Sequence, residues 1–248
     1  MATQHILPTL ENLNATIPED LDVEKVAREW QAAFTNALGA NDVGAAVAQV
    51  HPDGWWRDIF ALTWDLRSFQ GAAKITQFLQ DRLELSKLSG FKFLEAKLEA
   101  PYPDLKWIRT HFEFETTVAS GLVVALLVPT ANGEWKAFVV CTNLEGLKDH
   151  PERIGPLRNF LPNHGKWQQQ REEEQAFAGG DPEVLIVGAG QAGLDLGARL
   201  KLLGVNALIV EKFPRVGDLW RTRYQALCLH DPICEFSIHI FSMKSSHS

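Results

Sequence analysis

The feature that most constrains the fold is a glycine cluster between two short apolar runs. Val184–Val187 is continuously apolar, as expected of a parallel strand buried on both faces. Gly188, Gly190 and Gly193 follow it directly, and after a helical stretch a second apolar run, Ala207–Val210, ends in an acidic residue. These parts fall within about 30 residues, which is the context that a dinucleotide-binding β-α-β unit requires.

Each residue type in this cluster has a physical reason. Gly188 allows a tight turn, Gly190 lets the backbone approach a pyrophosphate, and Gly193 lets the helix pack closely on the strand. The N-terminus of the helix directs free N–H groups and its positive dipole end toward the phosphates. Glu211 would accept hydrogen bonds from ribose hydroxyls and would disfavour a 2′-phosphate, so FAD or NAD suits the site better than NADP. The alternative is a glycine-rich turn without a ligand. The predicted cofactor-binding residues of the loop are Gly188, Ala189, Gly190, Gln191, Ala192 and Gly193, and Glu211 joins them.

The segment after Glu211 carries a family resemblance. Residues 211–224 and Leu229–Pro232 resemble the segment that follows the first nucleotide fold in flavin-containing and Baeyer–Villiger-type (class B) flavin monooxygenases. The glycine-x-x-tryptophan element of that family maps onto Gly217 and Trp220, although many members have two glycines where this chain has Val216 and Gly217. The resemblance implies FAD as cofactor, NADPH as a co-substrate whose site is absent here, and oxygenation of a small organic substrate. It adds Lys212, Gly217 and Trp220 to the cofactor-binding residues and identifies no catalytic residue.

The first half of the chain has a different pattern. Glu24–Leu38 places apolar residues on one helical face, a short helix follows through Val50, and another begins at Gly71. Lys106–Thr117 then alternates strictly between apolar and polar residues, and an Asn-Gly pair at 132–133 predicts a hairpin between the next two strands. We expect an α+β domain in which helices pack on a curved antiparallel sheet.

This half resembles a nuclear-transport-factor-two-like cone, found ahead of the flavin fold in some monooxygenases of this class. The resemblance is carried by the helix with Trp30 and Phe34, by residues 51–58 and 62–65, and by Gly71. If the cone has lyase or isomerase chemistry of its own, the acid–base candidates are Asp58, Arg109 and His111. The alternative is that Trp55, Trp56 and Trp64 fill the mouth of the cone, which would then be a non-enzymatic module that binds a small ligand or forms a homodimer.

The expected organisation has five parts. They are a tail (1–22), the cone (23–148), a helical connector (149–182), the start of an FAD-binding Rossmann domain (183–232) and a final stretch (233–248) that does not continue the family pattern. We therefore expect a truncated, inactive fragment whose incomplete β-α-β unit is only marginally stable. His230 is either functional or solvent-facing.

Composition excludes several classes of partner. The net charge is -7 and the sequence has no cluster of lysines and arginines, which argues against nucleic acid or an anionic membrane as partner. Cys141, Cys228 and Cys234 lack metal-ligand spacing, and an odd number of cysteines argues against a disulfide framework. The sequence shows no signal peptide and no apolar stretch near the roughly 20 residues of a membrane span, so we expect a cytoplasmic protein without a metal site.

Overall fold

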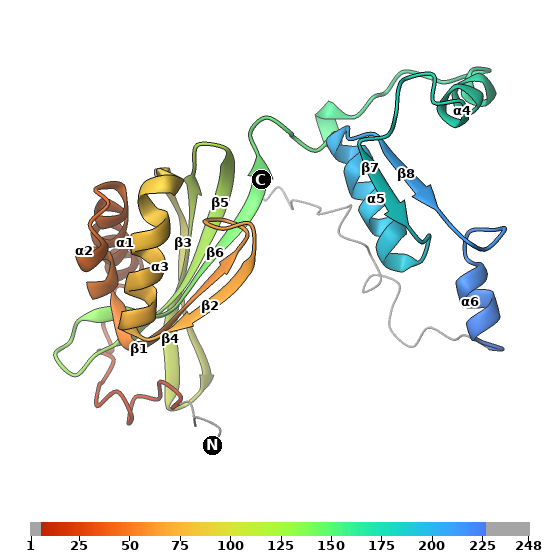
Figure 1. Ribbon diagram of the computed structural model, residues 1–248. Coiled ribbons are helices and arrows are strands. Elements are labelled where there is room, and N and C mark those ends of the chain that lie inside the picture. The colour runs from red at the N-terminus through yellow and green to blue at the C-terminus, as the bar shows by residue number, and fades with distance from the viewer. Residues whose placement is uncertain (1–5, 227–248) are drawn as a thin grey trace. The chain divides into compact units, whose positions relative to one another are not determined.

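A computed structural model describes residues 6–226 in two compact units, one ending at Asp149 and the other beginning at His150 (Figure 1). Cys228, His230, Cys234 and the stretch 233–248 lie outside the described residues. None of the helices within residues 6–226 is long and apolar enough to cross a membrane.

The first unit is a cone of helices on a curved sheet. Three helices, α1 (Val23–Gly39), α2 (Val43–Ala48) and α3 (Ala72–Ser86), cover one face of six strands in the order β2-β1-β6-β5-β4-β3 (Figure 1). The strands are β1 (Val50–Ile59), β2 (Leu66–Gln70), β3 (Ser89–Tyr102), β4 (Leu105–Glu115), β5 (Ala119–Pro129) and β6 (Trp135–Leu147). The predicted α+β cone is confirmed.

One pair of strands differs from the expected antiparallel sheet. The pair β1 and β6 is parallel, whereas every other neighbouring pair in this sheet is antiparallel. The sequence did not predict β1, because Pro52 and Gly54 interrupt the strand pattern. The structure accommodates them with a shift of register between Val50 and Trp55.

Helix caps and aromatic packing explain the core of the cone. Asp22 accepts a hydrogen bond from the amide of Lys25 (3.0 Å), which caps α1, and Asp42 caps α2 in the same way.

Aromatic rings pack between the helices and the sheet. On the buried face of α1, the rings of Trp30 and Phe34 stack with centroids 4.8 Å apart. Phe34 also contacts the buried rings of Trp56 and Phe112, so aromatic side chains fill the space between the helices and the sheet.

The second unit contains the predicted β-α-β arrangement. Strands β7 (Val184–Val187) and β8 (Ala207–Val210) form a parallel pair joined by α5 (Gln191–Leu203). The unit also holds the short 3-10 helix η1 (Gly155–Leu157), α4 (Trp167–Gln175) and α6 (Asp218–Arg223). Helix α5 packs on the face of the pair that carries Ile186, while on the opposite face Leu185 and Val187 are 59% and 83% exposed. The described unit thus contains a parallel β-α-β arrangement with one face of its strand pair covered by a helix.

Candidate functional site

The glycine loop joins β7 to α5 with the backbone that the sequence predicts. Gly188 has a φ of +104°, a conformation that residues with a side chain rarely adopt. A Cβ atom added to Gly188 would meet nothing within 4 Å, so the loop is open at this point. Gly190 is the N-cap of α5 and provides no side-chain cap, which leaves the first turn of the helix able to receive an anion.

The third glycine sets the packing of the helix. A Cβ atom added to Gly193 would lie 2.0 Å from the carbonyl oxygen of Gly188 and 3.3 Å from Cγ2 of Ile186. A Cβ atom added to Gly197, one turn later, would lie 2.7 Å from Cδ1 of Ile209 on β8, a side-chain end that could move. Glycine at position 193 therefore lets the start of α5 approach the end of β7 this closely, because the contact there is with backbone.

Glu211 reaches from the end of β8 across to the glycine loop. Its Oε2 accepts a hydrogen bond from the amide of Ala189 (2.6 Å), and its Oε1 accepts one from the amide of Phe213 (3.0 Å). The hydrogen bond from Phe213 and then that from Ala189 hold the pKa of this carboxyl below its usual value. An ionised hydrogen-bond acceptor therefore lies beside the glycine loop.

A cleft of ≈ 530 Å³ opens between these parts. Its lining residues are Val187, Gly188, Gly190, Val210, Glu211, Lys212, Phe213 and Leu219. The cleft combines the loop glycines with the acid at the end of β8, and Lys212 places its ammonium 5.0 Å from the ring centroid of Phe213. Of the ten residues predicted for the cofactor, four line this cleft, namely Gly188, Gly190, Glu211 and Lys212.

Of the other six predicted residues, Ala189, Gln191, Ala192 and Gly193 lie in the glycine loop and the first turn of α5, and Gly217 and Trp220 lie at the start of α6 and within it. Gly217 has a φ of +86° and is the N-cap of that helix, while Trp220 is 39% exposed and stacks on Tyr224 with ring centroids 5.8 Å apart. Asp218 is buried between Arg221 and Arg215. Burial favours its neutral form, but the hydrogen bonds and charges of the two arginines outweigh burial and lower its pKa.

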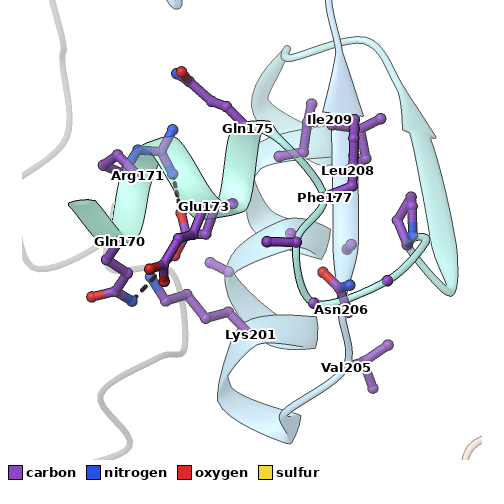
Figure 2. Close-up of a pocket in the computed structure, with 18 residues that line it drawn as sticks. Gln170, Arg171, Glu173, Gln175, Phe177, Lys201, Val205, Asn206, Leu208 and Ile209 are labelled. Carbon is purple, nitrogen blue, oxygen red and sulfur yellow. Dashed lines mark hydrogen bonds and ion pairs between the residues drawn. The ribbon is translucent and has the colours of Figure 1, made fainter. Parts of the chain in front are cut away.

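A larger cavity of ≈ 980 Å³ lies elsewhere in the second unit, between α4 and the side of α5 and β8 (Figure 2). Gln170, Arg171 and Glu173 of α4 line it together with Lys201 of α5. No residue of α4 is buried. The cavity is a gap under an exposed helix, away from the glycine loop, and we do not assign it a ligand.

The acid–base candidates of the cone are not brought together. Asp58 is fully buried on the helix-covered face of the sheet, next to Trp56. Its carboxylate accepts hydrogen bonds from the amide of Leu62, the amide and hydroxyl of Thr63, and the hydroxyl of Thr142. Asp58 thereby anchors the loop that follows β1, and these partners occupy both of its oxygens.

Arg109 and His111 lie on the opposite face of the sheet, because they alternate with the buried Ile108, Thr110 and Phe112 of β4. His111 Nδ1 is 3.0 Å from a carboxylate oxygen of Glu95. Arg109 Nε lies 2.8 Å from Glu99 in a contact that does not align as a hydrogen bond. The pKa of Glu99 is lowered, mainly by the hydrogen bond that Trp107 donates to its carboxylate and also by the nearby Arg109.

The three tryptophans expected to fill the mouth of the cone lie in different environments. Trp56 is fully buried in the core, and its indole N–H donates to Thr142 (3.2 Å). Trp55 alternates with Trp56 and is half-buried on the other face. Trp64 is 68% exposed, because the loop anchored by Asp58 turns it outward. Within residues 6–226 no group of three His, Cys, Asp or Glu side chains is placed to hold a metal ion.

Known proteins match short parts of the sequence. No protein-family model matches the chain. An oxidoreductase of Geobacillus kaustophilus described as uncharacterized and CzcO-like is 48% identical over 50 residues, which are 20% of this chain and 14% of that protein. The indole-3-pyruvate monooxygenase YUCCA4 of rice, Oryza sativa subsp. japonica, is 44% identical over 63 residues, which are 24% of this chain and 14% of that protein. The chain thus spans about a seventh of the length of these curated relatives.

Solved structures overlap with about half of the chain. A ketosteroid isomerase-like protein of Erwinia carotovora atroseptica shares 19% identity at a TM-score of 0.39, covering 52% of this chain and 98% of its own. A protein of unknown function with a cystatin-like fold from Nostoc punctiforme shares 14% identity at a TM-score of 0.39, covering 49% of this chain and 90% of its own.

Proposed function

We propose that the second unit is the beginning of the FAD-binding domain of a flavin-dependent monooxygenase, which uses NADPH and oxygen to oxygenate a small organic substrate. One observation carries the proposal. The carboxylate of Glu211, at the end of β8, lies 2.6 Å from the amide of Ala189 in the glycine loop that ends β7. A β-α-β unit that pairs this acid with this loop has the two recognition elements for the ADP half of a dinucleotide.

The residues present fit FAD. The open loop at Gly188 and the uncapped first turn of α5 would receive the pyrophosphate, and Glu211 would accept from the adenosine ribose. Its negative charge disfavours the additional 2′-phosphate of NADP. Gly217 and Trp220 would lie toward the flavin, by resemblance to the family. FAD, when bound, supplies the redox chemistry, and the protein holds and orients it.

The matches to known proteins support this assignment. The printed descriptions are an oxidoreductase and a monooxygenase, at 48% and 44% identity. Their matched lengths, 50 and 63 residues, are close to that of the nucleotide segment 183–232 and much shorter than the cone. We infer no acid–base reaction for the cone, because Asp58 lies on one face of its sheet and Arg109 and His111 on the other.

Titration of the purified chain with FAD tests the proposal. Binding is monitored by flavin fluorescence and by isothermal titration calorimetry. We expect saturable 1:1 binding. Gly188→Ala would force a side chain into a φ of +104°, and Glu211→Gln would remove the charged acceptor. Each variant should weaken FAD binding by about tenfold or more, in line with the ~1.5–3 kcal/mol of a hydrogen bond to a charged group.

Gly133→Ala is the matched control. Gly133 also has a positive φ (+83°) with nothing within 4 Å of an added Cβ atom, but it lies in the β5–β6 hairpin of the cone. It should leave the affinity for FAD unchanged. Absence of saturable binding in the unaltered chain, or equal losses in all three variants, would refute the assignment.

A further inference from the structure

The cone carries a second cleft that the flavin proposal does not use. It has a volume of ≈ 660 Å³ and opens between the edge strand β2 and helix α3, which lie side by side in Figure 1, with the loop 60–65 at one end. We call it the edge cleft. The residues that line it include Trp64, Arg67, Phe69, Lys74, Phe78 and Arg82. Its volume falls within the range of about 300–1,000 Å³ typical of small-molecule sites.

The floor of the edge cleft is aromatic. Phe69 of β2 and Phe78 of α3 stack with ring centroids 4.4 Å apart and an angle of 22° between the ring planes. Phe78 is 4% exposed and belongs to the core, whereas Phe69 is half-buried. At one end Trp64 adds an indole that is 68% exposed. A flat aromatic ligand in the edge cleft would therefore contact aromatic rings on the floor of the cleft and on one of its walls.

The loop that presents Trp64 is held from two sides. The buried carboxylate of Asp58 accepts from the amides of Leu62 and Thr63, and Arg82 of α3 donates from Nε to the carbonyl of Leu62 (2.9 Å). Phe60, at the start of the loop, has a φ of +56°, which is unfavourable for a bulky residue. Such strain persists where surrounding contacts over-determine the conformation, as at binding sites. A loop fixed this firmly loses little entropy when a ligand packs against its tryptophan.

The charges along the edge cleft favour an anion. Arg67, Lys74 and Arg82 provide three cations against the carboxylates of Asp65 and Asp81. The edge cleft thus has a local excess of positive charge, although the whole chain has a net charge of -7.

One of these cations is available to a ligand. Arg67 already pairs with Asp65 (3.3 Å), and Arg82 donates to the carbonyl of Leu62. Lys74 forms no ion pair within the described part of the chain. Lys74 and Arg82 are eight residues apart on α3, about 12 Å at 1.5 Å per residue, so cations stand toward both ends of the aromatic floor.

We propose that the edge cleft binds a small planar aromatic carboxylate, with the ring between Trp64 and the Phe69–Phe78 floor and the carboxylate on Lys74 at the rim. The site lies wholly within the cone. It is thus independent of whether the second unit binds FAD.

The test titrates the full chain with 2-naphthoate and, separately, with the neutral 2-naphthamide, by isothermal titration calorimetry. We expect saturable binding of 2-naphthoate that weakens with added salt, and at least fivefold weaker binding of 2-naphthamide. Trp64→Ala should weaken 2-naphthoate binding by about tenfold, and Trp64→Phe, which keeps a ring, by less. Lys74→Gln should reduce the affinity for 2-naphthoate about fivefold and leave that for 2-naphthamide unchanged.

Two matched controls separate the site from general effects. Trp167 of the second unit is 67% exposed, almost the same as Trp64, so Trp167→Ala removes an equivalent surface indole. Lys25 is the third residue of α1, as Lys74 is the third residue of α3, so Lys25→Gln removes a charge from an equivalent helical position. Neither should change binding. No saturable binding to the unaltered chain, equal affinity for the acid and the amide, or equal losses in the control variants would overturn the proposal.

Discussion

The two units differ in how completely they bury their own apolar surface. In the cone, a continuous core extends from Ala27 on α1 to Val140 on β6 and includes the fully buried Phe34 and Trp56. In the described part of the second unit, Ile186 and Ala189 are the buried apolar residues, and Val187 of the central strand pair is 83% exposed. The cone supplies both layers that a stable domain needs, whereas the β-α-β unit covers one face of its sheet and leaves the other open. A glycine loop with the predicted backbone can thus form on a strand pair that has only one covered face.

Removing a central ring of the cone should produce the largest effect. Phe34→Ala leaves a cavity among Trp30, Trp56 and Phe112, so the free energy of unfolding should fall by about 3–5 kcal/mol. Chemical denaturation followed by tryptophan fluorescence measures this. Trp64→Ala, at an exposed position, should change stability by less than about 0.5 kcal/mol. Equal effects of the two substitutions would show that the core is not where the structure places it.

Ligand binding should stabilise the two units unequally. FAD at 100 times its dissociation constant should stabilise a competent β-α-β unit by about 2.7 kcal/mol and leave the cone unaffected. Hydrogen exchange followed by mass spectrometry can resolve this, with slower exchange expected in β7, β8 and the first turn of α5. Slower exchange in the cone as well would mean that the two units unfold together, and would contradict the difference in stability between them.

Replacing the buried acid of the cone should have an intermediate effect. Asp58→Asn puts an amide N–H₂ group where the amides of Leu62 and Thr63 donate, so one or more donors lose their acceptor. We expect a loss of about 1–3 kcal/mol, measured by denaturation. Asp65→Asn, in the same loop but exposed, is the comparison and should cost much less. A neutral outcome for Asp58→Asn would contradict its anchoring role.

Acid should affect the second unit slightly, through Glu211. Since its pKa in the folded unit is lowered from 4.5, its contribution to stability is complete above pH 4.5 and is lost as the pH falls through the lowered folded value. As the pH is lowered in steps from 5, the amide of Ala189 should then lose protection from exchange, after correction for intrinsic rates. Glu211→Gln should abolish that pH-dependent difference. A difference that survives in the variant would have another source.

The sequence predicted those parts of the structure that depend on local pattern. The alternation from Lys106 to Thr117 placed Ile108 and Phe112 inward correctly, and the glycine spacing predicted the strand-turn-helix geometry at Gly188. Strand β1 was missed because Pro52 argues against a strand, and its pairing with β6 depends on residues more than 80 positions away.

The sites depend more on distant contacts. That Asp58 and His111 lie on opposite faces follows from the pairing of the strands, which the sequence does not reveal. In the alternative to an acid–base site, Trp64 was expected to fill the mouth of the cone together with Trp55 and Trp56. Its outward position results from the hydrogen bonds that Asp58 and Arg82 make to the loop, and no local pattern encodes them.

The parallel pairing of β1 with β6 also determines the order in which the protein can fold. The hydrogen bond from Trp56 to Thr142 spans 86 residues, and β1 has no neighbour on that side until β6 is present. Closing so long a loop is slow compared with forming the helices and hairpins inside it. During synthesis the sheet of the cone can therefore be completed only after β6 has left the ribosome, and β6 precedes the glycine loop in the chain.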